Sequence, residues 1–73
     1  MRYAEEQRLR FIDFLLDHYG FVRRSAVMDF FCVSQPQASA DIKRYMEVAP
    51  GNIEYDKSRK AYVKTESFCR VWE

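Results

Sequence analysis

The sequence has few of the residue types that catalysis and metal binding require. It holds one histidine, His18, and two cysteines, Cys32 and Cys69, which form no CxxC pair. A zinc or iron–sulfur site and a structural disulfide are therefore not expected. With two glycines in the whole chain, no glycine-rich phosphate loop is present. The carboxylates are scattered among basic residues, so we predict a protein without metal, cofactor or enzymatic activity.

Long apolar runs are also absent. No stretch of the sequence is long and apolar enough to cross a bilayer, and residues 1–6 do not resemble a signal peptide. A chain of 73 residues with 48% hydrophobic and 16% aromatic residues is typical of one small globular domain. We predict a cytoplasmic protein without membrane contact. Its domain is expected to span residues 1–64, with residues 65–73 as a tail.

The net charge is small, but its distribution is uneven. The whole chain carries +1 at neutral pH. Residues 21–64 hold eight Lys or Arg against five Asp or Glu, whereas residues 1–20 and 65–73 are each negative by one charge. A modest positive excess in the middle of the chain is consistent with contact to a polyanion.

Residues 34–48 predict the central helix of the domain. Ser34 and Gln37 have capping-box spacing, and Pro36 is tolerated in a first turn. At about 100° per residue an apolar stripe forms one side, made of Ala38, Ile42, Tyr45, Met46 and Ala49. The opposite side is predicted to hold Pro36, Gln37, Ala40, Asp41, Lys43, Arg44 and Glu47. This polar side alone is equally consistent with a solvated face.

Two shorter patterns precede this helix. Residues 4–18 show helical periodicity in Phe11, Ile12, Leu15, Leu16 and Tyr19, and Gly20 ends that helix. After an extended link at 21–24, Ser25 is predicted to cap a second helix over 26–31. The buried side of that helix is expected to comprise Val27, Phe30 and Phe31. A tight turn at Cys32 then completes a helix-turn-helix pattern.

Two alternating runs follow the central helix. Residues 50–52 end the helix, and residues 53–56 and 60–64 then predict the strands of a hairpin. Residues 57–59 form its tip, which carries cations suited to phosphates. The predicted fold is therefore α+β, a winged helix-turn-helix of three helices followed by a two-stranded β-hairpin wing.

These elements predict a surface that binds double-stranded DNA. Gln35, Gln37 and Ser39 would face bases in the major groove, where glutamine can pair with adenine. The complete set of expected DNA-binding residues is Arg23, Arg24, Ser25, Ser34, Gln35, Gln37, Ser39, Lys43, Arg44, Lys57, Ser58, Arg59 and Lys60. Tyr55 and Tyr62 are assigned to the packing of the hairpin and not to the site.

The sequence also resembles a known family. The run 34–41, then Tyr45, residues 49–52, residues 55–58 and residues 60–62 resemble the N-terminal winged helix-turn-helix of WYL-domain transcriptional regulators. The resemblance is greatest to repressors of bacterial anti-phage defence operons. It implies a dimer that binds an inverted-repeat operator through the third helix and the wing. Residues 65–73 are expected either to pack back on the domain as a short helix or strand or to begin a linker to a second domain.

Two alternatives to DNA binding follow from the same residues. The low net charge and the surplus apolar side chains Phe14, Phe68 and Trp72 are consistent with a winged helix that binds another protein. Binding of structured RNA through the same basic face is a second alternative. A continuous basic face over Arg24, Lys43 and Arg59 would favour nucleic acid.

Overall fold

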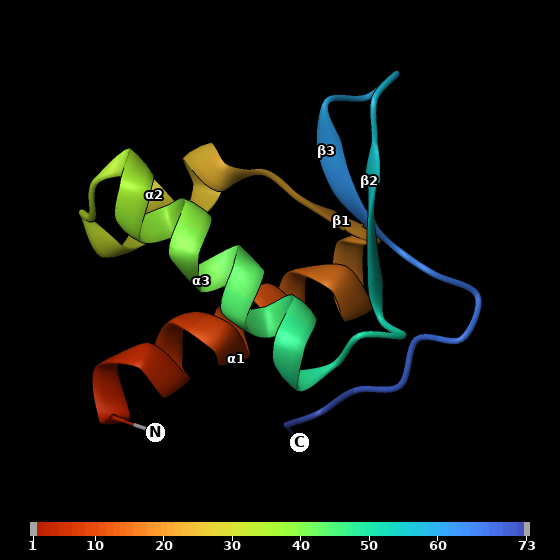
Figure 1. The fold of residues 1–73 in the computed structure, drawn as a ribbon, viewed down its shortest axis with the longest axis horizontal. Helices are drawn as coiled ribbons and strands as arrows, with labels where there is room; N and C mark the ends of the chain where they lie inside the picture. Colours follow the sequence, from red (N-terminus) through yellow and green to blue (C-terminus); the bar gives the residue numbers. More distant parts are fainter. Residues whose placement is uncertain (1, 73) are drawn as a thin grey trace.

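The fold was obtained as a computed structural model, which describes residues 2–72. Three helices pack on one side, and a small antiparallel sheet projects from the other (Figure 1). In chain order the elements are α1 (Tyr3–Tyr19), β1 (Phe21–Val22), α2 (Arg24–Phe31), α3 (Gln35–Val48), β2 (Ile53–Asp56) and β3 (Ala61–Lys64). The predicted winged helix-turn-helix fold is confirmed, and the helix ends lie within two residues of the predicted ones.

The sheet contains one strand more than the predicted hairpin. Strands β2 and β3 pair antiparallel, with Tyr55 opposite Tyr62, as the alternating pattern indicates. The link after α1 adds β1 to the free edge of β3, which places Phe21 opposite Val63. Two residues are too few to show strand periodicity, so this strand was predicted only as an extended link. It fixes the wing directly to the end of α1.

Two residues with left-handed backbone end the first two helices. Gly20 has a φ of 85° and donates its N–H to the carbonyls of Leu15 and Leu16, as its position predicts. Cys32 ends α2 with a φ of 54° and a ψ of 46°. A side chain in this conformation costs free energy that glycine would not. The turn between α2 and α3 is therefore tight and strained at Cys32.

The start of α2 differs from the prediction. The helix begins at Arg24, its N-cap is Arg23, and no side chain caps it. Ser25 therefore lies inside the first turn and is exposed. Phe30 is also exposed, at 66%, whereas Val27 is fully buried and Phe31 is partly buried. The exposure of Phe30 contradicts the predicted buried side of this helix, because its ring packs on Phe11 outside the core.

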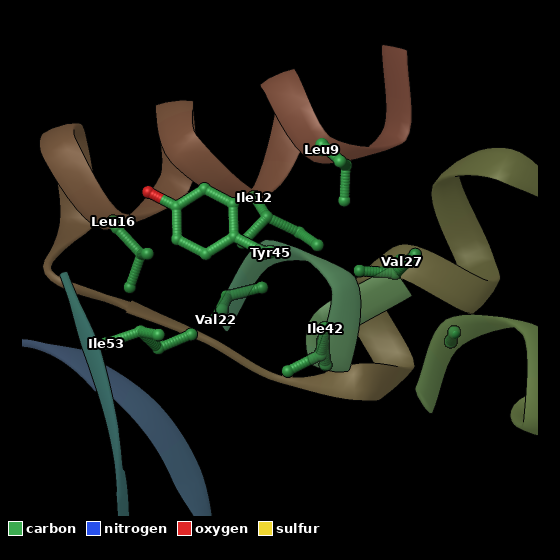
Figure 2. Close-up of a cluster of buried hydrophobic side chains, with 9 residues drawn as sticks. Leu9, Ile12, Leu16, Val22, Val27, Ile42, Tyr45 and Ile53 are labelled. Atoms are coloured by element: carbon green, nitrogen blue, oxygen red, sulfur yellow. The ribbon is translucent and has the colours of Figure 1, made fainter. Parts of the chain in front are cut away.

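The core lies between the three helices and the base of the sheet (Figure 2). It is formed by Leu9, Ile12, Leu16, Val22, Val27, Ala38, Ile42, Tyr45 and Ile53. Tyr19, which was predicted on the buried side of α1, is 65% exposed because it lies at the end of the helix. Leu9 and Asp13 are fully buried on α1 instead. The core thus follows the predicted stripe of α3 closely and that of α1 only in part.

Residues 65–72 have no helix or strand, yet they pack against the core. Phe68 and Trp72 are partly buried on the core cluster. The buried carboxylate of Asp13 accepts hydrogen bonds from the backbone N–H groups of Val71 and Trp72, at 3.0 and 3.1 Å. Asn52 exchanges two hydrogen bonds with the backbone of Cys69. The tail is therefore attached to α1 and to the turn after α3.

Candidate nucleic-acid interface

The first turn of α3 presents exposed polar side chains. Ser34 is the N-cap, and its hydroxyl accepts the backbone N–H of Gln37 at 3.3 Å, as the capping pattern predicts. The Ser34 hydroxyl thus already accepts a hydrogen bond within the protein as the cap of α3. Gln35, Pro36 and Gln37 are all exposed around the capped end. Gln35 and Gln37, both predicted site residues, thus carry exposed amides at the start of α3.

The rest of the outer face of α3 carries small side chains near the start of the helix and cationic side chains further on. Ala40 and Lys43 are exposed, and Ser39 is half-buried at the flank that faces α2. Arg44 is exposed and forms an ion pair with Glu47 at 3.3 Å. Lys43 follows Ser39 by four residues and so shares its side of the helix. The glutamate beside Arg44 lowers the positive charge at the far end of this face.

Two arginines at the start of α2 join α3 to the wing. Arg24 Nη1 donates to the hydroxyl of Ser39 at 3.2 Å. Arg23 Nη2 donates to the backbone carbonyl of Arg59 at the tip of the wing, at 3.3 Å. The predicted site residues Arg23, Arg24, Ser39 and Arg59 are therefore brought together although they come from three separate elements. Ser25 makes none of these contacts.

The tip of the wing is ordered by one carboxylate. Asp56 Oδ1 accepts the backbone N–H groups of Ser58 and Arg59, at 2.9 and 3.2 Å. Lys60 then adopts a left-handed φ of 53°, which turns the chain into β3. All four tip residues, 57–60, are exposed. The tip thus holds three exposed cationic side chains on a defined backbone, and Asp56 also pairs with Arg59 at 3.8 Å.

A shallow pocket between α2 and the wing contains two residues that sequence reasoning left out of the site. It is lined by Arg24, Tyr55, Lys60 and Tyr62. The two tyrosine rings pack with their centroids 4.9 Å apart, and Tyr55 is 49% exposed. Cross-strand pairing explains their contact, which alternation predicts. Their position beside two cations could not be predicted, because it depends on how the start of α2 approaches the wing.

The flank of α3 that faces α1 corrects another prediction. Asp41 was expected on the exposed side, but it is only 1% exposed. Its Oδ2 lies 2.7 Å from Nε of Arg8 on α1, and its Oδ1 accepts Nε2 of Gln37 at 3.0 Å. The arginine on α1 neutralises the buried carboxylate, which is why an aspartate can lie there. Arg8 and Asp41 were both missed as neighbours of the site.

A separate aromatic surface lies between α1 and the end of α2. An open groove there is lined by Gln7, Arg10, Phe11, Phe14, Phe30, Phe31, Arg70 and Trp72. The rings of Phe11 and Phe30 stack at 4.4 Å, with 14° between their planes. Arg70 lies over Phe14, with 5.9 Å from its guanidinium carbon to the ring centroid. Of the surplus apolar side chains seen in the sequence, Phe14 and Trp72 line this groove, whereas Phe68 packs against the core outside it.

Residues 2–72 contain no cluster of three or more His, Cys, Asp or Glu side chains that could hold a metal ion. Cys32 and Cys69 are both exposed and unbonded. In the same residues, the longest apolar helical stretch falls short of what a membrane crossing needs.

Comparison with known proteins agrees with this geometry. A family model described as the BrxR transcriptional regulator winged helix-turn-helix domain matches residues 4–72. A protein of Escherichia coli strain KTE188, named DNA-binding transcriptional repressor CapW, is 45% identical over 71 residues. Proteins of the same name from Pseudomonas aeruginosa and Stenotrophomonas maltophilia are 46% identical over 71 residues and 41% identical over 68.

The similarity covers nearly all of this chain but a minor part of each relative. The matched residues make up 97% of this chain and 24% of the Escherichia coli and Pseudomonas aeruginosa proteins. For the Stenotrophomonas maltophilia protein the shares are 93% and 23%. The chain therefore spans about a quarter of the length of these relatives. The resemblance to the winged helix-turn-helix of transcriptional regulators is confirmed.

Proposed function

The chain belongs to the family of BrxR transcriptional regulator winged helix-turn-helix domains, and on that basis we propose that it binds double-stranded DNA as part of a transcriptional repressor. Helix α3 enters the major groove with its first turn, and the wing contacts the neighbouring phosphates. The proposed role is binding without catalysis, in the cytoplasm where bacterial DNA lies. It agrees with the function that the relatives' names describe for those proteins.

The observation that carries the proposal is the contact of Arg24 with Ser39. Through it the start of α2 lies against the outer face of α3, while Arg23 reaches the tip of the wing. Cations from α2 and the wing thus border the same exposed helix face. Phosphate contacts fix the register and orientation of a recognition helix on the duplex. The cations beside α3 support this role although the net charge is only +1.

The proposed roles divide the predicted site into three groups. Gln35, Gln37 and Ser39 face bases. Phosphate contacts are assigned to Arg23, Arg24, Lys43, Arg44, Lys57, Arg59 and Lys60. Ser25, Ser34 and Ser58 are assigned to the phosphate backbone. The Ser34 hydroxyl already accepts the cap hydrogen bond of α3, and the Ser58 N–H already binds Asp56, so Ser58 would contribute through its hydroxyl.

Selection of bound duplexes from a random pool tests this function directly. The chain should enrich one sequence motif, and gel shifts with that motif should weaken steeply as salt rises. Gln37→Ala should lower discrimination at particular base pairs while leaving the affinity for unrelated duplex nearly unchanged. Absence of any duplex binding at low salt would contradict the proposal.

We further propose that two copies bind an inverted repeat. The groove of Phe11, Phe14, Phe30 and Trp72 is the apolar surface available for contact between copies or with other parts of a longer chain. Two-fold symmetry in the selected motif is the expected result. Sedimentation of the protein on that motif should give two chains per duplex, and one chain per duplex would contradict this part.

The same groove also favours a second candidate function, that of a winged helix that binds another protein. Phe30 stacks on Phe11 and is still 66% exposed. An apolar groove that stays exposed in this way is typical of a surface that binds another protein. Phe30→Ser should leave the affinity for a duplex that carries one half of the selected motif within about twofold if DNA binding is the function of α3 and the wing. Loss of protein partners without loss of DNA binding would assign the groove to this second role.

A further inference from the structure

One contact of α1 bears on which base α3 can recognise. Gln37, the proposed base-reading residue, does not project freely from α3. Its Nε2 donates to Asp41 Oδ1 at 3.0 Å, and Asp41 Oδ2 accepts from Nε of Arg8 at 2.7 Å. These three side chains, which we call the Arg8 relay, connect α1 to the outer face of α3. Arg8 lies 33 residues before Asp41 and outside the helix-turn-helix itself.

The chemistry of the relay determines the orientation of the Gln37 amide. A guanidinium only donates hydrogen bonds, and an ionised carboxylate only accepts them. Asp41 can therefore face the NH₂ group of Gln37 and not its carbonyl oxygen. Among residues 2–72 the carbonyl oxygen Oε1 of Gln37 has no hydrogen-bond partner, and the residue is exposed. It remains available, together with the second N–H of Nε2, for a ligand.

An amide held in this way has a preferred partner in the major groove. Its free carbonyl oxygen accepts a hydrogen bond, so it suits bases that present an amino group there, which are adenine through N6 and cytosine through N4. The second N–H can then reach N7 of adenine. Guanine and thymine present oxygen acceptors at the corresponding edge, and these oppose the carbonyl oxygen.

We propose that the Arg8 relay sets the base preference of Gln37 for adenine or cytosine, with Arg8 as a positioning residue that does not touch the base. The inference rests on the proposed DNA binding. Burial supports the role of Arg8: Asp41 is 1% exposed, and the side chain of Arg8 is 16% exposed. A buried carboxylate is stabilised by a charged partner at hydrogen-bond distance. The Arg8 guanidinium is that partner, because its Nε lies 2.7 Å from Asp41 Oδ2.

Asp41→Asn provides a test, because it should reverse the orientation of the Gln37 amide. Because Arg8 only donates, the new amide would turn its oxygen to Arg8 and its NH₂ to Gln37. Gln37 must then present its carbonyl oxygen inward and its NH₂ outward. Selection from a random duplex pool should change the preferred base at one position from adenine or cytosine to guanine or thymine. The expected change in relative affinity is on the order of tenfold at that position.

Three variants separate this change from a general loss of structure. Gln37→Ala should abolish the preference at that position, and adding Asp41→Asn to it should then have no further effect. Arg8→Gln, which leaves Asp41 in place, should reduce discrimination there at least threefold while affinity for unrelated duplex changes less than twofold. Lys64→Gln, at the exposed end of β3 and outside both the relay and the aromatic groove, is the control for loss of a positive charge and should leave the motif unchanged.

A measurement without DNA keeps the inference testable if a variant binds poorly. In the unmodified chain, the Nε2 proton of Gln37 that faces Asp41 should exchange slowly with solvent hydrogen. In Arg8→Gln this exchange should become fast. A motif that depends on Gln37 but is unchanged by Asp41→Asn would overturn the relay. A chain that selects no motif at all would contradict the proposed function instead, so the two failures can be told apart.

Discussion

The phenol of Tyr45 on α3 donates a 2.5 Å hydrogen bond to Oδ1 of Asp13 on α1, and both side chains are fully buried. Asn52 donates to the same phenol oxygen at 3.1 Å. The other oxygen of Asp13 accepts the backbone N–H groups of Val71 and Trp72. The inner side of α3 is thus joined through one carboxylate to α1 and to the tail.

This network predicts loss of stability in alkali. Burial, and then the hydrogen bond to Asp13, raise the pKa of Tyr45 above its ordinary value of 10.0. Above pH 10 an unfolded chain therefore loses the Tyr45 proton while the folded chain keeps it. Stability from this group is complete below that pH and falls by about 1.4 kcal/mol per pH unit above it. Urea unfolding from pH 8 to 11 measures the decline.

Tyr45→Phe isolates that effect from other groups that titrate in alkali. At neutral pH the variant should be less stable by about 2–3 kcal/mol, because a buried carboxylate oxygen of Asp13 loses its donor. Since phenylalanine cannot ionise, the gap between the two proteins should narrow as pH rises above 10. A constant gap from pH 8 to 11 would show that Tyr45 does not titrate as described.

Asn52→Ala should detach the tail from the turn after α3. Asn52 is 5% exposed and binds the phenol of Tyr45 and the backbone of Cys69. Its loss should cost about 2–3 kcal/mol, because buried partners are left without hydrogen bonds. Trp72, the one tryptophan of the chain, should then shift its fluorescence emission to longer wavelength.

Ser67→Ala is the matched control for that experiment. Ser67 lies in the same tail, but its hydrogen bond to the Gly51 carbonyl is exposed. The variant should change stability by less than about 1 kcal/mol and leave the Trp72 emission in place. Equal effects of the two substitutions would mean that Asn52 has no special role in holding the tail.

Cys32→Gly should stabilise the protein. The left-handed backbone at Cys32 costs roughly 1–2 kcal/mol for a residue with a side chain. Glycine removes that cost but loses about 0.5–1 kcal/mol through greater freedom of the unfolded chain. The expected net gain is about 0.5–1 kcal/mol in thermal or urea unfolding. Cys32→Ala removes the thiol but keeps the strain, so a gain of the same size in that variant would contradict the explanation.

Lys57→Ala should weaken DNA binding without changing which sequence is bound. Lys57 is exposed at the tip of the wing, and a lost phosphate contact lowers the slope of log affinity against log salt by about 1. Lys64→Ala removes an equal charge at the end of β3 away from the tip and should leave that slope unchanged. Equal slopes for the two variants would remove the wing from the interface.

The elements that could be predicted from sequence depend on neighbours close along the chain. The cap of Ser34, the left-handed Gly20 and the alternation of β2 with β3 involve residues within a few positions of each other, and each is confirmed. The inner stripe of α3, buried at Ala38, Ile42 and Tyr45 and partly buried at Met46 and Ala49, likewise follows from helical periodicity. Such local rules were enough for the fold class, whereas the family followed from the resemblance of the sequence to winged helix-turn-helix regulators.

The tertiary structure decided where the polar groups lie inside and beside the site. Asp41 is buried because Arg8 meets it from another helix, and Asp13 is buried because its partners come from α3 and the tail. Periodicity cannot place a carboxylate inward, because burial of a charge depends on a partner that is distant in sequence. Likewise β1 depends on its pairing with β3, and the pocket of Tyr55 depends on Arg24 of α2 and Lys60 of the wing, which are distant in sequence.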